Sequence, residues 1–100
     1  MHIVIWEFRA KEGLEAQFEE AYGPNGVWVQ FFRRGDGFLG TELLRDDTVA
    51  RRYLAIDRWT TAAAYETFRQ RHFDEYQTID RQCETLTEYE GRLGTFDVNA

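Results

Sequence analysis

The chain has 100 residues, of which 43% are hydrophobic, and its formal net charge at pH 7 is −6. This length suits one domain with its own core, and the hydrophobic content together with a single proline excludes a disordered protein. Because the net charge is negative and no basic stripe is present, we expect neither nucleic acid nor an anionic membrane as a partner.

Residues 2–9, HIVIWEFR, predict a first strand, because β-branched and aromatic residues follow one another there. Successive side chains of a strand point to opposite faces of the sheet. One face of this strand would carry His2, Val4, Trp6 and Phe8. The other face would carry Ile3, Ile5, Glu7 and Arg9. Both faces are therefore partly apolar, and Trp6 is expected on the side that helices cover.

A helical pattern follows the first strand and begins at Gly13. Its apolar residues recur at helical spacing and would form one stripe made of Leu14, Phe18, Ala21 and Tyr22. The GPNG sequence at 23–26 must end this helix. A second short helix is expected around Trp28, Phe31 and Phe32, and RRGDG at 33–37 ends it.

Two strands joined by a short polar loop come next. Residues 38–45 and 51–59 have strand composition, and DDTVA at 46–50 connects them, so we expect an antiparallel hairpin. Strict alternation along the first of these strands would place Phe38 with Leu44 on one face, and Leu39 with Leu43 on the other.

A long helical pattern runs from 61 to 86. Its stripe advances by three or four residues at each step and consists of Tyr65, Phe68, His72, Tyr76, Ile79, Cys83 and Leu86. Thr60 or Thr61 can cap its start. A straight helix of this length would be about 39 Å long, more than the roughly 30 Å width of such a domain, so we expect a bend near 72–74.

The end of the chain predicts a fourth strand, at 92–98. The polar runs EAQFEE, near the start, and ETLTEYE, which precedes this strand, are expected to be solvated helix faces.

The order strand, helix, strand, strand, helix, strand predicts an α+β fold, the ferredoxin-like split βαβ with a four-stranded antiparallel sheet, as a single domain over 1–100. Helices in that fold cover one face of the sheet. The apolar residues of the other face would be exposed, which is unusual for a monomer. We therefore expect a homodimer that packs sheet face against sheet face across a two-fold axis.

Several kinds of site are missing from the sequence. The histidines, His2 and His72, and the single cysteine, Cys83, have no metal-ligand spacing, so we expect no metal. There is no glycine-rich phosphate loop, and no serine that could act as a nucleophile. On the apolar stripe, Cys83 is expected to be an inert buried thiol. The first residues show neither a signal peptide nor a membrane span, and with the lone cysteine this predicts a cytoplasmic protein.

Residues 53–76 contain a concentration of aromatic side chains that allows two interpretations. Aromatic residues at helical spacing are most often core. However, the indole N–H of Trp59, the phenol of Tyr65 and the imidazole of His72 need polar partners when buried, so the same residues could line a ligand pocket.

Four stretches resemble the antibiotic biosynthesis monooxygenase family, which are dimeric α/β barrels. They are IVIWEFRAKEGLEAQFEEAY, GFLGTELLRD, YLAIDRWTTAAAYETF and the HF that follows. Members of this family include enzymes that oxygenate polycyclic aromatic phenols without metal or flavin, enzymes that degrade haem and enzymes that act on quinols. The resemblance implies the fold, a pocket and a monooxygenase reaction that needs no cofactor.

The members that oxidise polyketides use an Asn, a Trp four residues later and a Tyr six residues after the Trp. Here Trp59 and Tyr65 match, whereas Ala55 replaces the Asn. Arg81 is the counterpart candidate for an arginine further along that helix.

The haem-degrading members resemble this chain less. Their Asn, Trp and His positions are occupied here by Trp6, Phe68 and Gln77, and His72 lies one turn away from the expected iron ligand. These differences argue against haem degradation.

The resemblance and the residue types together predict a site for a small aromatic ligand. We expect His72, as a neutral base, together with Tyr65 and Trp59, to be catalytic. The residues expected to bind the substrate are Trp6, Phe68 and Tyr76.

Asp57 shares a strand face with Trp59 and is a secondary catalytic candidate, which would need a partner if buried. Two functions remain open. The first is a cofactor-independent monooxygenase of a small aromatic phenol or quinol. The second is a non-catalytic homodimer that binds a small molecule or has an accessory role. The loss of the amide at Ala55 favours the second function, and the presence of Trp59, Tyr65 and His72 favours the first.

Overall fold

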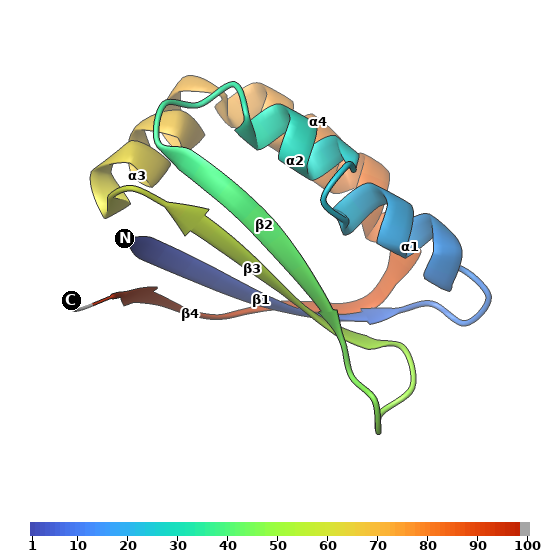
Figure 1. Ribbon diagram of the computed structural model, residues 1–100. Helices are drawn as coiled ribbons and strands as arrows, with labels where there is room; N and C mark the ends of the chain where they lie inside the picture. Colours follow the sequence, from blue (N-terminus) through green and yellow to red (C-terminus); the bar gives the residue numbers. More distant parts are fainter. Residues whose placement is uncertain (99–100) are drawn as a thin grey trace.

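The computed structural model describes residues 1–98 and forms one sheet with a layer of helices above it (Figure 1). In chain order the elements are β1 (His2–Ala10), α1 (Glu15–Tyr22), α2 (Val27–Phe32), β2 (Phe38–Arg45), β3 (Arg52–Trp59), α3 (Ala62–Arg71), α4 (Phe73–Cys83), a 3₁₀ turn (Glu84–Leu86) and β4 (Thr87–Asp97).

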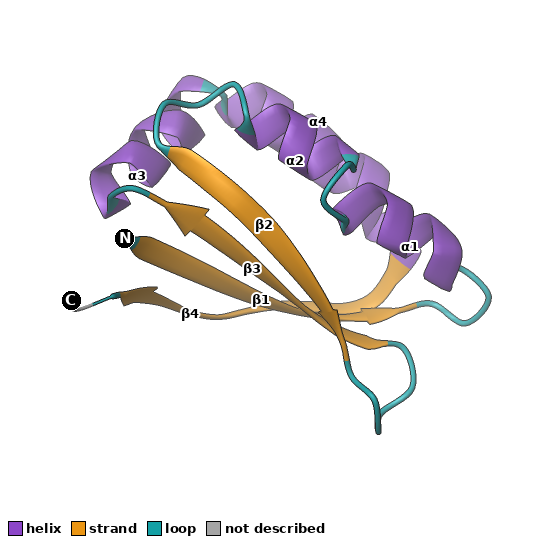
Figure 2. Cartoon of the chain, in the orientation of Figure 1, coloured by secondary structure: helices purple, strands orange, loops and turns teal. Residues whose placement is uncertain are grey.

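The four strands pair in the spatial order β2-β3-β1-β4, and every neighbouring pair is antiparallel. Each half of the chain contributes a crossover: α1 and α2 connect β1 to β2, and α3 and α4 connect β3 to β4. All the helices lie on the same face of the sheet (Figure 2). The ferredoxin-like split βαβ fold expected from the sequence is confirmed.

The face of the sheet beneath the helices carries the core. Along β3, buried and half-buried residues alternate without interruption, and Tyr53, Ala55, Asp57 and Trp59 are the buried ones. Strand β1 follows the predicted alternation, with His2, Val4 and Phe8 buried and Trp6 packed against the core. The period of two in these strands thus places the inward-facing residues as expected.

The alternation predicted for β2 is wrong at its first residues. The register with β3 shifts between Phe38 and Gly40, which is a β-bulge, and Gly40 has a φ of +145° that favours glycine. Leu39 is the extra residue and is exposed, and Phe38, just before it, faces the core beside Trp59. Phe38 therefore lies on the same side as Leu43 rather than with Leu44.

The bend predicted in the long helical pattern is confirmed. His72, with φ −116° and ψ 29°, separates α3 from α4. Thr61 caps α3, because its hydroxyl oxygen accepts a hydrogen bond from the backbone N–H of Ala64 at 3.0 Å. The break allows both helices to pack over a sheet that a straight helix would overrun.

The fourth strand begins at Thr87, earlier than predicted, and the ETLTEYE run is not a helix face. It forms the 3₁₀ turn and the start of β4, where Tyr89 pairs with Arg9 and Glu90 with Phe8. The unpaired edge of β1 offers backbone hydrogen bonds at this point, and pairing with it outweighs the helical pattern of the sequence.

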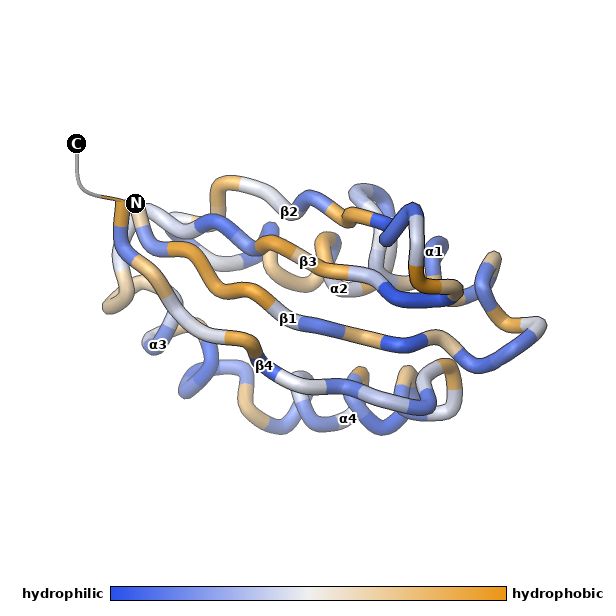
Figure 3. Tube along the Cα trace, turned by 90° about the horizontal axis from the view of Figure 1, so that it is seen from below, coloured by the Kyte–Doolittle hydropathy of each residue, from blue (hydrophilic) through white to orange (hydrophobic). Residues whose placement is uncertain are grey.

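The other face of the sheet carries no helix. Figure 3 looks onto this face and shows hydrophobic segments of β1 and β3 side by side, where Ile5 pairs with Ile56. Leu44 on β2 and Phe96 on β4 are exposed at 40% and 52%. The apolar, uncovered face that the sequence predicted is therefore present. No helix within residues 1–98 is long and apolar enough to cross a membrane.

Candidate functional site

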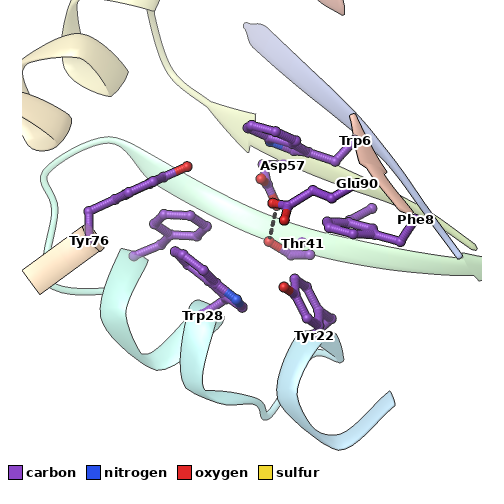
Figure 4. A pocket seen from close by; sticks show the side chains of 10 residues that line it. Trp6, Phe8, Tyr22, Trp28, Thr41, Asp57, Tyr76 and Glu90 are labelled. Atoms are coloured by element: carbon purple, nitrogen blue, oxygen red, sulfur yellow. Dashed lines mark hydrogen bonds between the residues drawn. The ribbon is translucent and has the colours of Figure 1, made fainter. Parts of the chain in front are cut away.

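A small cavity lies between the sheet and the helix layer, and residues from all four strands and three of the helices line it (Figure 4). Its wall consists of Trp6, Phe8, Tyr22, Trp28, Phe32, Thr41, Ala55, Asp57, Tyr76 and Glu90. The cavity therefore combines a mainly aromatic surface with two carboxyl groups.

The free volume of the cavity is about 30 Å³. One water molecule needs roughly 10–15 Å³ of such space, and pockets for drug-sized ligands have about 300–1,000 Å³. The cavity is not sealed, because the exposed Glu90 forms part of its wall. In this conformation it admits water-sized groups, and an aromatic ring enters only if side chains at the open side move.

Asp57 is the buried carboxyl of this cavity, with 4% of its surface exposed. It sits opposite Thr41 in the hairpin register, and the Thr41 hydroxyl donates a hydrogen bond to Asp57 Oδ1 at 2.7 Å. Burial raises the pKa of the Asp57 carboxyl to about 6, and the hydrogen bond from Thr41 opposes part of this rise. Asp57 is thus a stronger base than an ordinary aspartate and is still mostly ionised at neutral pH.

Glu90 is the second carboxyl, at the surface end of the cavity. Partial burial, together with the nearby carboxylates of Asp80 and Glu84, raises its pKa to about 7. Two carboxyl groups that can exchange protons near neutral pH therefore line one cavity, one buried and one exposed.

The aromatic wall is a continuous series of neighbouring rings. Ring centroids are 6.4 Å apart for Trp6 and Phe8, 4.6 Å for Phe8 and Tyr22, and 6.1 Å for Tyr22 and Trp28. The series ends with Trp28 and Tyr76, whose rings meet edge to face at 5.2 Å. Such a wall offers flat apolar surface to a planar ligand.

Burial, more than any other cause, raises the pKa of the Tyr22 and Tyr76 phenols far above its ordinary value. Both hydroxyl groups therefore keep their protons at any pH in which the protein is folded, and both can donate hydrogen bonds.

Of the residues predicted from the sequence to form the site, Trp6 and Tyr76 lie on the cavity wall. Trp59, Tyr65 and Phe68 are buried side by side next to it, with the Trp59 ring 5.5 Å from Tyr65 and 5.4 Å from Phe68. They belong to the packed core cluster rather than to the wall.

His72 lies at the break between α3 and α4, half-buried, with its ring 4.7 Å from Phe68 and 6.0 Å from Phe31. Together with Phe68 and Arg34 it borders a separate surface hollow of about 360 Å³, and not the cavity that contains Asp57. Because the helix breaks at this residue, His72 and Tyr76 do not share a continuous helix face.

Several wall residues were not singled out from the sequence. Tyr22 and Trp28 lie on apolar stripes, where a pocket residue looks the same as a core residue. Glu90 lies in a run that was expected to be helical. Asp57, the secondary catalytic candidate of the sequence, does lie on the wall. Its partner Thr41 was not named, and the usable signal for it was the hairpin pairing that places it opposite Asp57.

The described residues contain no group of three or more His, Cys, Asp or Glu side chains that could hold a metal ion. The polar groups on the cavity wall are the Asp57 and Glu90 carboxyls, the Tyr22 and Tyr76 phenols, the Trp6 and Trp28 indoles and the Thr41 hydroxyl.

Residues 1–79 match the sequence profile of the antibiotic biosynthesis monooxygenase family. The chain belongs to this family. The resemblance seen in the sequence is thus confirmed over most of the chain. Among curated proteins, no sequence matches this chain.

Solved structures share the fold. A mutant of SnoaB, a cofactor-independent oxygenase from Streptomyces nogalater, is 22% identical, with a TM-score of 0.80 over 99% of this chain and 93% of that one. Another SnoaB structure is 25% identical, with a TM-score of 0.73 over the same shares. PA3566 from Pseudomonas aeruginosa is 21% identical, with a TM-score of 0.70 over 99% of this chain and 94% of that one.

Proposed function

We propose that this protein is a cofactor-independent monooxygenase of a small aromatic phenol or quinol, with Asp57 as the base that starts the reaction. The observation that carries the proposal is a buried carboxyl group, hydrogen-bonded to Thr41, on the wall of an aromatic cavity. Membership of the family and the likeness in fold to a cofactor-independent oxygenase support the reaction type.

The reaction begins when the Asp57 carboxylate takes the proton of the substrate hydroxyl. A phenol has a pKa of about 10, so a carboxylate whose pKa is raised to about 6 is a better acceptor than one near 3.9. The resulting anion is rich in electrons and donates them to O₂ without a cofactor.

In the overall reaction a ring C–H and the C–OH of the phenol both become C=O. The ring loses four electrons and two hydrogens, one from the C–H and one as the hydroxyl proton that Asp57 took, and O₂ takes the four electrons. One oxygen atom becomes the new carbonyl oxygen and the other leaves as water. The proton held by Asp57 returns to the departing oxygen, which leaves the carboxylate ready for another turnover.

Substrate binding requires the wall to open, because the free volume is about 30 Å³. Trp6, Tyr76 and Glu90 reach the surface, as does the smaller Thr41, so the ring enters on the side of these three larger residues. In the bound state Trp6 covers the ring from the sheet and Tyr76 from α4.

The test is oxygen uptake by the purified protein with a panel of hydroxyaromatic compounds. We expect uptake with at least one of them, and a loss of roughly 100-fold or more in Asp57→Asn, because removing a general base costs about 10²–10⁴ in rate. Asp47→Asn, at an exposed loop position, is the matched control and keeps the wild-type rate. The rate of the wild-type protein should rise as the pH passes about 6, because the ionised carboxyl is the active form.

Wild-type oxygen uptake by Asp57→Asn would remove Asp57 from the mechanism. The roles predicted for His72, Tyr65 and Trp59 stay predictions, and the same assay tests them. A base at His72 requires that His72→Ala lose activity, and a polar role of Tyr65 requires that Tyr65→Phe do so.

A second candidate is a non-catalytic protein that binds a small ligand. The small free volume and the methyl group of Ala55 on the cavity wall favour it, since Ala55 offers no polar contact to a substrate. Binding of an aromatic compound without any oxygen uptake would decide for this function.

We also propose that the protein is a homodimer that buries the uncovered sheet face. Ile5, Ile56, Leu44 and Phe96 support this assembly, because they leave an apolar surface that a second copy would cover. We also propose a cytoplasmic location, because the single cysteine, Cys83, is a free thiol, which suits a reducing compartment.

A further inference from the structure

Two polar atoms on the cavity wall are buried and have no hydrogen-bond partner within residues 1–98. They are the hydroxyl oxygen of Tyr22 and the indole nitrogen of Trp28. The exposed fraction is 5% for Tyr22 and 7% for Trp28. Burying a donor without a partner costs free energy, so such groups are normally paired with protein or water. The buried Cys83 thiol lies beside both groups, but sulfur is only a weak acceptor, so an oxygen in the cavity would pair with them better.

The two groups are neighbours, although they come from different helices. Tyr22 ends α1 and Trp28 lies at the start of α2, across the GPNG turn, and their ring centroids are 6.1 Å apart. The indole N–H is close enough to lower the pKa of the Tyr22 hydroxyl slightly, yet the pair does not have hydrogen-bond geometry. A single acceptor atom between them could receive a hydrogen bond from each.

The neighbouring groups make this an acceptor site. The indole N–H can only donate, and the Tyr22 hydroxyl keeps its proton because burial and the nearby Glu90 carboxyl raise its pKa. In Figure 4 both polar atoms lie on the helix side of the cavity, whereas Asp57 and Glu90 lie on the sheet side. The cavity therefore has donors on one side and carboxyl groups on the other.

We propose that the Tyr22 hydroxyl and the Trp28 indole N–H form a binding subsite for an acceptor oxygen of the ligand, such as a carbonyl oxygen, opposite Asp57. The subsite makes Tyr22 and Trp28 specificity-determining residues, because a ligand with a CH₂ group at that position would leave both donors unpaired. This inference deepens the proposed function. It rests on that function in one respect, that the cavity is where the substrate binds.

The test compares two probes that differ by one oxygen atom, 4-hydroxyacetophenone and 4-ethylphenol, by calorimetric titration of the purified protein. They differ in the carbonyl oxygen and share the hydroxyl that would face Asp57. We expect the ketone to bind about tenfold more tightly, since each hydrogen bond adds a modest gain. Tyr22→Phe should lower the affinity for the ketone and leave that for the ethyl compound unchanged.

Tyr22→Phe keeps the ring and removes an unpaired hydroxyl, so it should fold. Trp28→Phe is the second variant and should reduce the same preference. Tyr53→Phe is the matched control, because Tyr53 is a buried tyrosine off the cavity wall whose hydroxyl bonds to Glu19. The preference for the ketone should persist in it.

Equal affinity for the two probes, or no binding of either, would overturn the subsite, since the two donors would then form hydrogen bonds only to water. A preference for the ketone that survives both Tyr22→Phe and Trp28→Phe would overturn it as well. Selective binding without oxygen uptake would refute the oxygenase and leave the subsite standing. Oxygen uptake without selectivity would refute the subsite alone.

Discussion

Asp57 is ionisable and lies in the interior of the protein, which costs the folded state free energy whenever the carboxyl is charged. Its one hydrogen bond within the described chain, from Thr41, offsets part of that cost. Functional sites commonly contain residues that line a cavity and destabilise the fold. The effect of Asp57 on stability can be measured without any substrate.

The pKa of Asp57 is raised to about 6 in the folded protein, against about 3.9 in an unfolded chain. Between roughly pH 4 and pH 6 the folded state therefore binds more protons than the unfolded state, and the contribution of Asp57 to the free energy of unfolding falls as pH rises. The loss is complete above the folded pKa and amounts to about 3 kcal/mol.

Asp57→Asn should therefore be more stable than the wild type at pH 8, by about 2 kcal/mol, and should have no such advantage at pH 4. The amide oxygen can still accept the Thr41 hydrogen bond. Glu90, the other carboxyl on the wall, is present in both proteins, so its effect largely cancels in the comparison. Urea unfolding at the two pH values measures the difference. A difference that does not change with pH would mean that Asp57 has an ordinary pKa.

At the scale of an element, α3 connects the sheet to the aromatic core. Its cap residue Thr61 lies two residues after Trp59, the end of β3, and the helix ends at His72 after ten residues. Tyr65 and Phe68 on its inner face pack against Trp59. The position of these rings therefore depends on a short helix whose first turn is held by one side-chain hydrogen bond.

Thr61→Ala removes that hydrogen bond to the Ala64 N–H and should lower the free energy of unfolding by about 1 kcal/mol. For a domain of this size the melting temperature should fall by about 4–8 °C. Thermal unfolding followed by circular dichroism measures it. Thr60→Ala is the control, because no hydrogen bond within residues 1–98 uses the Thr60 hydroxyl, and equal losses in the two variants would contradict the capping role.

At the scale of the whole molecule, the uncovered sheet face is the surface through which we propose that the protein dimerises. Ile56 on β3 lies near the middle of this face, paired with Ile5 on one side and with Glu42 on the other. A second copy would remove this surface from water, and burial of apolar area is the main force in such assemblies.

Light scattering after gel filtration should give the mass of a dimer for the wild type and of a monomer for Ile56→Lys. The lysine places a charge on the proposed interface, where its burial would cost free energy, while the backbone pairing with Glu42 is kept. Gln77→Lys, at an exposed position of α4, should remain a dimer. A wild-type protein that is monomeric at all concentrations, or a dimeric Ile56→Lys, would rule out this interface.

Wherever structure depends on neighbours along the chain, the sequence alone was enough. The inward positions of Trp6 and Asp57, the two helical stripes, a threonine cap at Thr60 or Thr61 and a break near 72–74 follow from strand and helix periods and from the length of the domain. What only the tertiary structure decided depends on backbones that meet from afar. The bulge at Gly40 reverses the face of Phe38, and pairing with β1 converts the run around Glu90 into strand.

The cavity belongs to the second class. Tyr22, Trp28 and Glu90 come from different elements, and nothing in their local pattern separates them from core or surface residues. Trp59 and Tyr65 are the opposite case. The sequence assigned them to the pocket, but they pack in the core. A cavity is the small volume that packed elements leave unfilled, so its wall is set by how the helices lie on the sheet, which no local pattern encodes.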